Sequence, residues 1–313
     1  MLLQWDLNNK SLHKRYVEIC DEEFEIYFES IVQNILAFSK VKVLTISGPS
    51  SSGKTTTAYK LACNLKDDGI ATKIISMDDF YKNRSDYARK PDGTLDYETI
   101  NSLDTDFLIQ CLTEAIALGR TKLPKYDFAE GKRRPDLVDF ELCEHEMIII
   151  EGLHGLNPRI IDSLPSENVR SIYTTIGEQV FLPNVPNEPS EIVFSKRDIR
   201  LLRRLVRDYK YRGATPEYTF QLWDGVREGE ELYIFPYENN AHIKINSFYK
   251  YELNVVKNQA VDLLAEIKAD SAYYAKAQEL VSKLASVIPI NEEYVPSRSL
   301  IREFIGDSIY HNH

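Results

Sequence analysis

A strand, a glycine-bounded loop and a helix are predicted over residues 43–56, and this stretch constrains the chain more than any other. Its sequence, VLTISGPSSSGKTT, opens with five mostly β-branched or apolar residues and continues as G-x-x-x-x-G-K-[ST]. A loop of this kind turns backbone N–H groups inward, and the next helix points its positive N-terminal end at the same place. The stretch therefore predicts an anion-binding loop in an α/β fold; an ordinary glycine–serine turn is the alternative.

The residues of the loop have expected roles in holding a nucleoside triphosphate with Mg²⁺. We expect Lys54 to reach the β- and γ-phosphates and the Thr55 hydroxyl to bind Mg²⁺. The other residues expected to cradle the nucleotide are Gly48, Ser50, Ser51, Ser52, Gly53 and Thr56.

Composition narrows the class of protein. A chain of 313 residues with 43% hydrophobic content can bury a sizeable core, and it lacks the 18-residue apolar run of a membrane span. Its N-terminus does not resemble a secretory signal, and its four cysteines lack a C-x-x-C pair, so we expect reduced thiols and a cytoplasmic protein. The net charge of −10 disfavours nucleic-acid binding, because phosphate contacts supply most non-specific affinity.

Acidic residues follow two predicted strands. Asp78 and Asp79 come after the strand at 71–76, and Glu151 ends the apolar strand at 147–152. Ligands of open α/β sheets bind beyond the carboxyl ends of the strands, so these acids are candidates for chemistry. We expect Glu151 to hold Mg²⁺ directly or through water. Capping of a turn is the alternative for the two aspartates.

Arginines recur along the helix predicted at 195–213, which Ser195 and Asp198 can cap and Gly213 can end. One face carries arginines at i, i+3, i+4 and i+7: Arg200, Arg203, Arg204 and Arg207. Arginine binds phosphate oxygens bidentately, so this face is interpreted as a lid that closes over a triphosphate. A solvated basic face is the alternative.

These pieces, in this order, resemble the uridine kinase branch of the phosphoribulokinase/uridine kinase family of P-loop kinases. The resemblance covers about residues 40–306. The motifs that carry it are GPSSSGKTT (48–56), MDDFYK (77–82), LDYE (95–98), KYDF (125–128), IIIEGLHGL (148–156) and DIRLLRRLVRDYKYRG (198–213). The combination is specific for the family and less specific for the substrate.

The resemblance implies transfer of a phosphoryl group from ATP to the 5′-hydroxyl of a nucleoside such as uridine or cytidine. Asp78 matches the family's catalytic aspartate, which accepts the hydroxyl proton. Thr55, Glu151 and Asp78 match the groups around Mg²⁺. The arginines that match phosphate-facing lid residues are Arg204, Arg207 and Arg212.

The acceptor half of the resemblance rests on a loop and a predicted hairpin. Asp96 matches an acid that binds ribose hydroxyls, and Tyr126 and Phe128 match aromatics that line the nucleoside pocket. The alternation of these two aromatics with polar residues also predicts that both lie on one face of a strand. Ordinary packing within the hairpin is the alternative to a role in lining the pocket. Two positions depart from the uridine kinase pattern: Gly131 replaces a histidine that reads the base, and Ala214 replaces an arginine.

The expected fold is an α/β P-loop NTPase sandwich of three layers. It has a mostly parallel sheet, a β-hairpin over the site and an arginine-bearing lid helix. We expect three parts: an N-terminal helical appendage (1–40), the kinase core (41–247, with the lid at about 195–240) and C-terminal helices docked on it (248–313). Within the core, Asp104 and Gly119 are expected to bound a helix over about 105–118.

Alternative functions remain open at this stage. The acceptor could be another small alcohol, such as a sugar phosphate, pantothenate or glycerate. The chain could also be a nucleotide-binding regulatory protein without turnover, although it retains the residues that catalysis needs. The sequence leaves the oligomeric state open, a homo-oligomer included.

Overall fold

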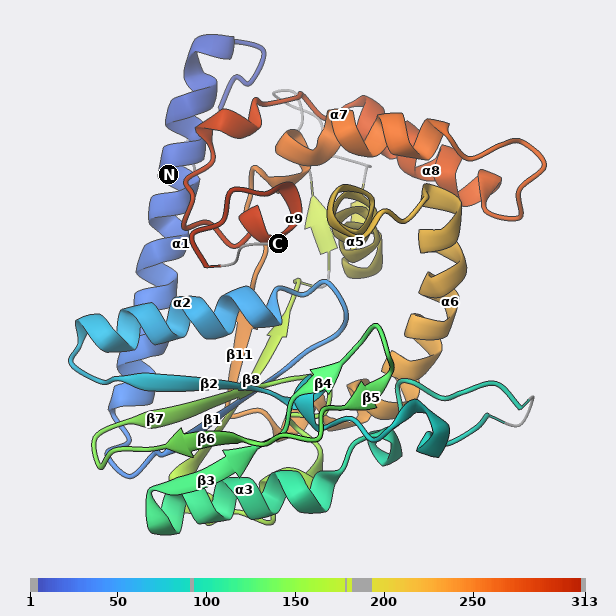
Figure 1. Ribbon diagram of the computed structural model, residues 1–313. Helices are drawn as coiled ribbons and strands as arrows, with labels where there is room; N and C mark the ends of the chain where they lie inside the picture. The colour runs from blue at the N-terminus through green and yellow to red at the C-terminus, as the bar shows by residue number, and fades with distance from the viewer. Residues whose placement is uncertain (1–4, 91–92, 178, 182–192, 311–313) are drawn as a thin grey trace.

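A five-stranded sheet forms the centre of the computed structural model, which describes residues 5–90, 93–177, 179–181 and 193–310 (Figure 1). Its strands are β1 (Val43–Ser47), β2 (Thr72–Ser76), β7 (Met147–Glu151), β8 (Val169–Thr175) and β11 (Ile243–Asn246). They lie in the order β11-β8-β1-β7-β2, and every neighbouring pair is parallel. All residues of β1 and β7 are buried, as expected of strands that are covered on both faces.

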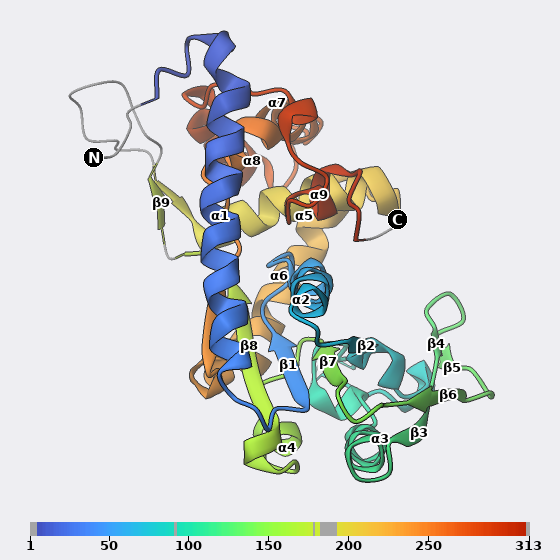
Figure 2. The same ribbon diagram turned by 90° about the vertical axis from the view of Figure 1, so that its left-hand side faces the viewer.

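Helices cover the two faces of the sheet. One face packs against α1 (His13–Leu36) and α2 (Lys54–Asp67), and the other against α3 (Thr105–Leu118) and α4 (Pro158–Ile161). Figure 1 shows α2 above the strands and α3 below them, and Figure 2 shows α1 running the length of the molecule. The predicted three-layer α/β sandwich is therefore confirmed.

Both ends of α3 follow the predicted capping. The Asp104 carboxylate accepts a hydrogen bond from the Phe107 N–H at 3.2 Å. Gly119, with φ of +68°, ends the helix in the left-handed conformation that glycine favours. The helix predicted at about 105–118 is thus confirmed.

The predicted hairpin consists of two short antiparallel pairs in succession. In the first, β3 (Arg120–Leu123) pairs with β6 (Val138–Glu141); in the second, β4 (Tyr126–Asp127) pairs with β5 (Lys132–Arg133). Figure 2 shows this hairpin extending away from the central sheet. A further antiparallel pair joins β9 (Gln179–Phe181) and β10 (Val193–Ser195).

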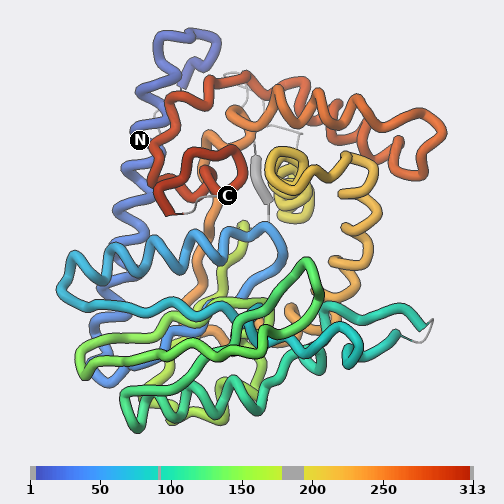
Figure 3. Tube along the Cα trace, viewed as in Figure 1, coloured from blue at the N-terminus to red at the C-terminus, as the bar shows by residue number. Residues whose placement is uncertain are grey.

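Beyond residue 195 the chain is mostly helical, with β11 as its one central-sheet strand among the described residues. The helices of this part are α5 (Lys196–Arg212), α6 (Pro216–Tyr233), α7 (Glu252–Ala265), α8 (Tyr274–Ala285) and α9 (Arg302–Ile305). Helix α5 packs against α6, α7 and α9, and Figure 3 shows the C-terminal segment lying between α1 and α5. The boundaries of the three predicted parts stay a prediction, but their apolar residues share one core cluster. Within the described residues, none of the helices combines the length and hydropathy that a membrane span needs.

We expect the docked C-terminal segment to contribute to the stability of the whole domain. Phe304 of α9 is fully buried and its ring lies 4.9 Å from the Arg203 guanidinium carbon. Phe304→Ala should lower the free energy of unfolding by about 3–5 kcal/mol, measured in urea, because it leaves a cavity. The control is Ile309→Ala, at a side chain that is 63% exposed, which should change it by less than about 0.5 kcal/mol. Equal effects of the two variants would contradict docking.

Candidate active site

A cleft of about 280 Å³ lies beyond the carboxyl ends of β1, β2 and β7. The phosphate loop, the two acid-bearing strand ends, α5, α6 and the C-terminal segment all contribute to its walls. Because these ends of parallel strands are where α/β proteins bind ligands, the cleft is the candidate active site.

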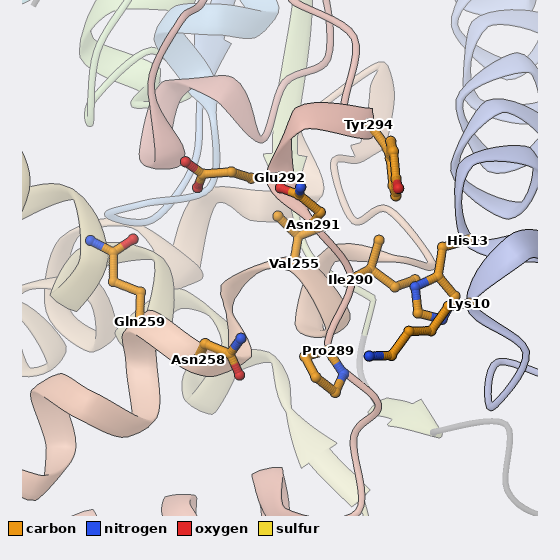
Figure 4. Close-up of a pocket in the computed structure, with 10 residues that line it drawn as sticks. All are labelled: Lys10, His13, Val255, Asn258, Gln259, Pro289, Ile290, Asn291, Glu292 and Tyr294. Atoms are coloured by element: carbon orange, nitrogen blue, oxygen red, sulfur yellow. The ribbon is translucent and has the colours of Figure 1, made fainter.

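A larger cavity of about 530 Å³ lies elsewhere, between the start of α1, α7 and the segment at 288–294 (Figure 4). Carboxamides and apolar side chains line it, together with Lys10, His13 and Glu292. Neither the phosphate loop nor a strand end reaches it. We therefore place the chemistry in the smaller cleft.

The geometry of the phosphate loop explains its glycines. A Cβ atom at Gly48 would lie 2.1 Å from the Thr174 carbonyl oxygen of β8, and Gly53 has φ of +84°. Ser51 also takes a left-handed conformation, with φ of +59°, which costs a serine about 1 kcal/mol. The hydroxyl oxygens of Ser51 and Ser52 are buried without a hydrogen-bond partner in the protein. These unpaired donors fit a loop that binds an anionic ligand.

Lys54, Thr55 and Glu151 meet on the floor of the cleft. The Thr55 hydroxyl donates to Glu151 at 3.3 Å, and the Ser76 hydroxyl donates to the other oxygen of Glu151 at 2.8 Å. Lys54 donates to the Pro49 carbonyl at 3.1 Å, and burial lowers the pKa of its amine. Thr55 and Glu151 are two of the three residues predicted around Mg²⁺, and in the structure they are in direct contact.

Asp78, the third, stands on a 3₁₀ turn over Met77–Phe80 that follows β2. Its carboxylate opens into the cleft, yet protein encloses the cleft around it. This enclosure, and then the negative charge of Glu151, raise the pKa of Asp78 to about 7. A carboxylate with a pKa near neutrality is suited to accept a proton at physiological pH.

The neighbouring Asp79 has a different environment. Its carboxylate accepts hydrogen bonds from the Lys125 amine at 2.5 Å and from the Tyr126 N–H at 3.3 Å. It therefore ties the start of the hairpin to the end of β2, and it does not line the cleft. For Asp79 the structure supports a local structural role.

Two acids of the LDYE stretch point in different directions. Asp96 accepts hydrogen bonds from the Tyr233 hydroxyl at 2.7 Å and the Glu98 N–H at 3.2 Å, and it does not line the cleft. Glu98 lines it, and burial, followed by the charge of Glu230, raises the pKa of Glu98 to about 7. The structure therefore presents Glu98 to a ligand where the sequence analysis expects Asp96.

The predicted aromatic wall is also arranged differently. Tyr126 is buried and its hydroxyl lies 3.1 Å from that of Tyr87, whereas Phe128 is 58% exposed. Neither lines the cleft, although their ring centroids are only 5.0 Å apart. Tyr81 lines it instead and contacts Tyr126 edge-on, with 5.9 Å between centroids. Tyr126 thus supports the aromatic residue that faces the ligand space.

Asp208 gathers three arginines at the mouth of the cleft. The buried Asp208 carboxylate lies 3.1 Å from Arg204, 2.8 Å from Arg207 and 3.4 Å from Arg212. Arg204 also donates to the Ser50 hydroxyl at 2.9 Å. All three arginines line the cleft, where the sequence analysis expects phosphate-facing residues.

The other two arginines of the predicted stripe do not line the cleft. Arg200 and Arg203 form ion pairs with Glu230 and Glu252, and each of these four side chains is only 1% exposed. The prediction of one continuous phosphate-facing stripe is corrected on this point. Arginines spaced three or four residues apart lie on one face of a helix, but the spacing does not show which groups of the folded protein contact that face.

Glutamates from distant parts of the chain complete the cleft. Glu230 of α6 accepts a hydrogen bond from the Ser50 N–H at 2.8 Å, and Glu303 of α9 accepts one from the Thr56 hydroxyl at 2.5 Å. Sequence reasoning missed both, together with Asp208, Glu98 and Tyr81. Glu303 left a signal, because it and Arg302 interrupt the otherwise apolar stretch Leu300–Ile305. Glu230 lies in an acidic stretch and left no such signal.

The residues present fit a nucleotide-bound Mg²⁺. No cluster of three or more His, Cys, Asp or Glu side chains able to hold a metal occurs in the part of the chain that the structure describes. Mg²⁺ usually binds through one or two protein oxygens, substrate phosphates and water, so no larger cluster is needed. Thr55 and Glu151 supply such oxygens next to the phosphate loop.

The fold and the cleft define an α/β protein whose P-loop opens into a cleft lined by acids and arginines. Residues 43–173 match the model of the phosphoribulokinase / uridine kinase family. Uridine kinase of Clostridium novyi (strain NT) is 27% identical over 229 residues, covering 72% of this chain and 98% of that protein. Uridine kinase of Macrococcus caseolyticus (strain JCSC5402) is 29% identical over 209 residues, covering 66% and 88%.

Among solved structures, that of a possible uridine kinase from Bacillus stearothermophilus is 26% identical, with a TM-score of 0.41 over 48% of this chain and 80% of that one. Over residues 43–173 the chain is therefore similar to the phosphoribulokinase / uridine kinase family.

The raised pKa of Asp78 has a consequence for stability. An acid whose pKa is about 3.8 in the unfolded chain and about 7 in the folded one destabilises the fold as it ionises, so stability falls as pH rises between these values. Asp78→Asn should therefore increase the free energy of unfolding at pH 8 by about 1–2 kcal/mol, allowing for solvent screening, and by less at pH 4.5. Urea unfolding at both pH values measures this difference. The same gain at both would contradict a raised pKa.

Proposed function

We propose that the protein transfers the γ-phosphoryl group of ATP to the 5′-hydroxyl of a nucleoside, giving ADP and the nucleoside monophosphate. One observation carries the proposal: Asp78, with a pKa of about 7, shares a cleft with the phosphate loop. The loop proposed to hold ATP and the acid proposed to accept the hydroxyl proton thus line one cleft, which supports the proposal, because phosphoryl transfer requires both groups at one place.

The proposed reaction assigns tasks to several side chains of the cleft. The acceptor oxygen forms a bond to the γ-phosphorus while the bond to the β–γ bridging oxygen breaks, and the hydroxyl proton passes to Asp78. Lys54 and the loop hold the β- and γ-phosphates, and Arg204 and Arg207 stabilise charge on the transferring group. Bound Mg²⁺ would neutralise negative charge on the phosphate oxygens, held next to Thr55 and Glu151.

The assignment of Asp78 as base is tested by turnover. Asp78→Asn should lower kcat by about 10²-fold or more while ATP affinity changes little, because only general-base catalysis is lost. In the unsubstituted protein, kcat should rise with pH up to about 7 as the carboxylate ionises. ADP release at a series of pH values measures both. Near-normal turnover in the variant would exclude Asp78 as the base.

Glu98 is proposed as the acid that binds acceptor hydroxyl groups. Glu98 lines the cleft. Its side chain packs closely against the backbone of α6 at Gly229, because a Cβ atom at that position would lie only 2.4 Å from the Glu98 Cβ. The proposal replaces Asp96, whose oxygens already bind Tyr233 and the Glu98 N–H.

The two acids can be compared directly. Glu98→Gln should raise the KM for the acceptor about tenfold or more and leave the KM for ATP within about twofold, because one charge-assisted hydrogen bond is lost. Asp96→Asn is the matched control and should change the acceptor KM less. Steady-state kinetics with the best acceptor gives the result. The reverse order of effects would restore Asp96 as the ligand.

A second candidate acceptor, another small alcohol, is favoured by one observation. At Gly131 the space that a side chain would fill is taken by Arg84, whose guanidinium carbon lies 2.6 Å from an added Cβ. In this structure the Arg84 side chain therefore lies where the uridine kinase pattern has a histidine that reads the base. ADP release in a screen of nucleosides, sugar phosphates, pantothenate and glycerate separates the two. If none of the tested compounds causes ADP release, both candidates are contradicted in favour of a regulatory protein without turnover.

A further inference from the structure

The phosphate loop is held from behind by a buried arginine. Arg203 of α5 forms an ion pair with Glu252 at 2.5 Å and donates a hydrogen bond to the Ser51 carbonyl at 3.2 Å. It also binds the carbonyl and hydroxyl of Ser247, at 2.9 and 3.1 Å. The Ser247 hydroxyl in turn donates to the Ser52 carbonyl at 2.7 Å. One side chain thus connects α5, the end of β11, α7 and the loop.

A second buried arginine holds the preceding residue of the loop. Arg200 makes two hydrogen bonds to Glu230, at 2.5 and 2.8 Å, and donates to the Ser50 carbonyl at 3.0 Å. Glu230 itself accepts from the Ser50 N–H at 2.8 Å. Three consecutive loop carbonyls, at Ser50, Ser51 and Ser52, are therefore bound by groups on the side of the loop facing α5 and β11.

The planarity of the peptide bond turns these contacts into control of the loop's N–H groups. In a trans peptide the carbonyl of one residue and the N–H of the next point in opposite directions. Fixing the Ser50 and Ser52 carbonyls therefore orients the N–H groups of Ser51 and Gly53 the other way, as an anion nest needs. The left-handed conformation of Ser51 is unfavourable for a serine, and Arg203 holds its carbonyl in place.

We propose that Arg200 and Arg203 are positioning residues that pre-organise the phosphate loop and do not contact the nucleotide. The proposal rests on the proposed use of ATP at this loop. It divides four arginines of α5 into two sets: Arg200 and Arg203 bind the loop's carbonyls, and Arg204 and Arg207 line the cleft. The two sets follow one another along one helix, so the loop-binding and the cleft-lining arginines keep a fixed spacing.

The two roles predict different nucleotide preferences. A pre-organised loop binds the β-phosphate, which ADP and ATP share, whereas an arginine that binds the γ-phosphate would distinguish them. Replacing both members of the pair, Arg203→Met with Glu252→Leu, removes the loop contact without leaving an unpaired buried charge. We expect the Kd of both ADP and ATP to rise at least tenfold in this double variant, measured by titration calorimetry.

The control is Lys60→Met, which removes a buried lysine paired with Glu25 on another face of the molecule. It should lower stability and leave both Kd values unchanged. If the double variant does not fold, Ser247→Ala removes the contact to the Ser52 carbonyl and should weaken both nucleotides in parallel. Weaker binding of ATP alone, or no change in either nucleotide, would overturn the positioning role. An unsubstituted protein that binds neither nucleotide would overturn the proposed function as well.

Discussion

Two arginine–glutamate pairs inside the protein determine where α5 stands relative to the phosphate loop. A buried ion that loses its partner costs about 3–5 kcal/mol, so Arg200 and Arg203 keep α5 close to Glu230 and Glu252. Displacing the predicted lid (about 195–240) would break the Arg203–Glu252 pair and the bond from Arg200 to the Ser50 carbonyl, although Glu230 would move together with Arg200. Rearrangement around a ligand is therefore expected in the cleft-facing side chains and at the Arg212 end of α5, where the side chain is exposed.

The cleft balances opposite charges before any ligand arrives. Five carboxylates and four cations line it, and burial shifts the pKa of Asp78 and Glu98 upward and that of Lys54 downward, each toward the neutral form. Glu303 lies 4.0 Å from Arg207. On the proposed function, phosphate oxygens bind cations that these carboxylates now neutralise. Nucleotide affinity then reflects an exchange of anions, which weakens it relative to a purely cationic site.

The sequence predicts what short-range chemistry determines. The loop at 48–55 carries its own conformational requirements, and α3 begins and ends where its capping residues place it, so both were predictable. The partition of the arginines was not, because it depends on Glu230 and Glu252, which lie 30 and 49 residues further along the chain. The same limit hid Glu303, whose contact with Thr56 spans 247 residues. Periodicity identifies a face, and only the packed fold shows what meets it.

The acceptor side depends on finer differences. Asp96 and Glu98 are two residues apart, and either satisfies the requirement for an acid there; the fold separates them, because Tyr233 binds the first and the second reaches the cleft. At the hairpin tip, the Arg84 N–H donates to the Gly131 carbonyl and its guanidinium donates to the Phe128 carbonyl. These bonds hold a cation where the uridine kinase pattern places a histidine. On the proposed function, the residues that would hold ATP are not part of this exchange, so phosphoryl transfer and acceptor choice would depend on separate contacts.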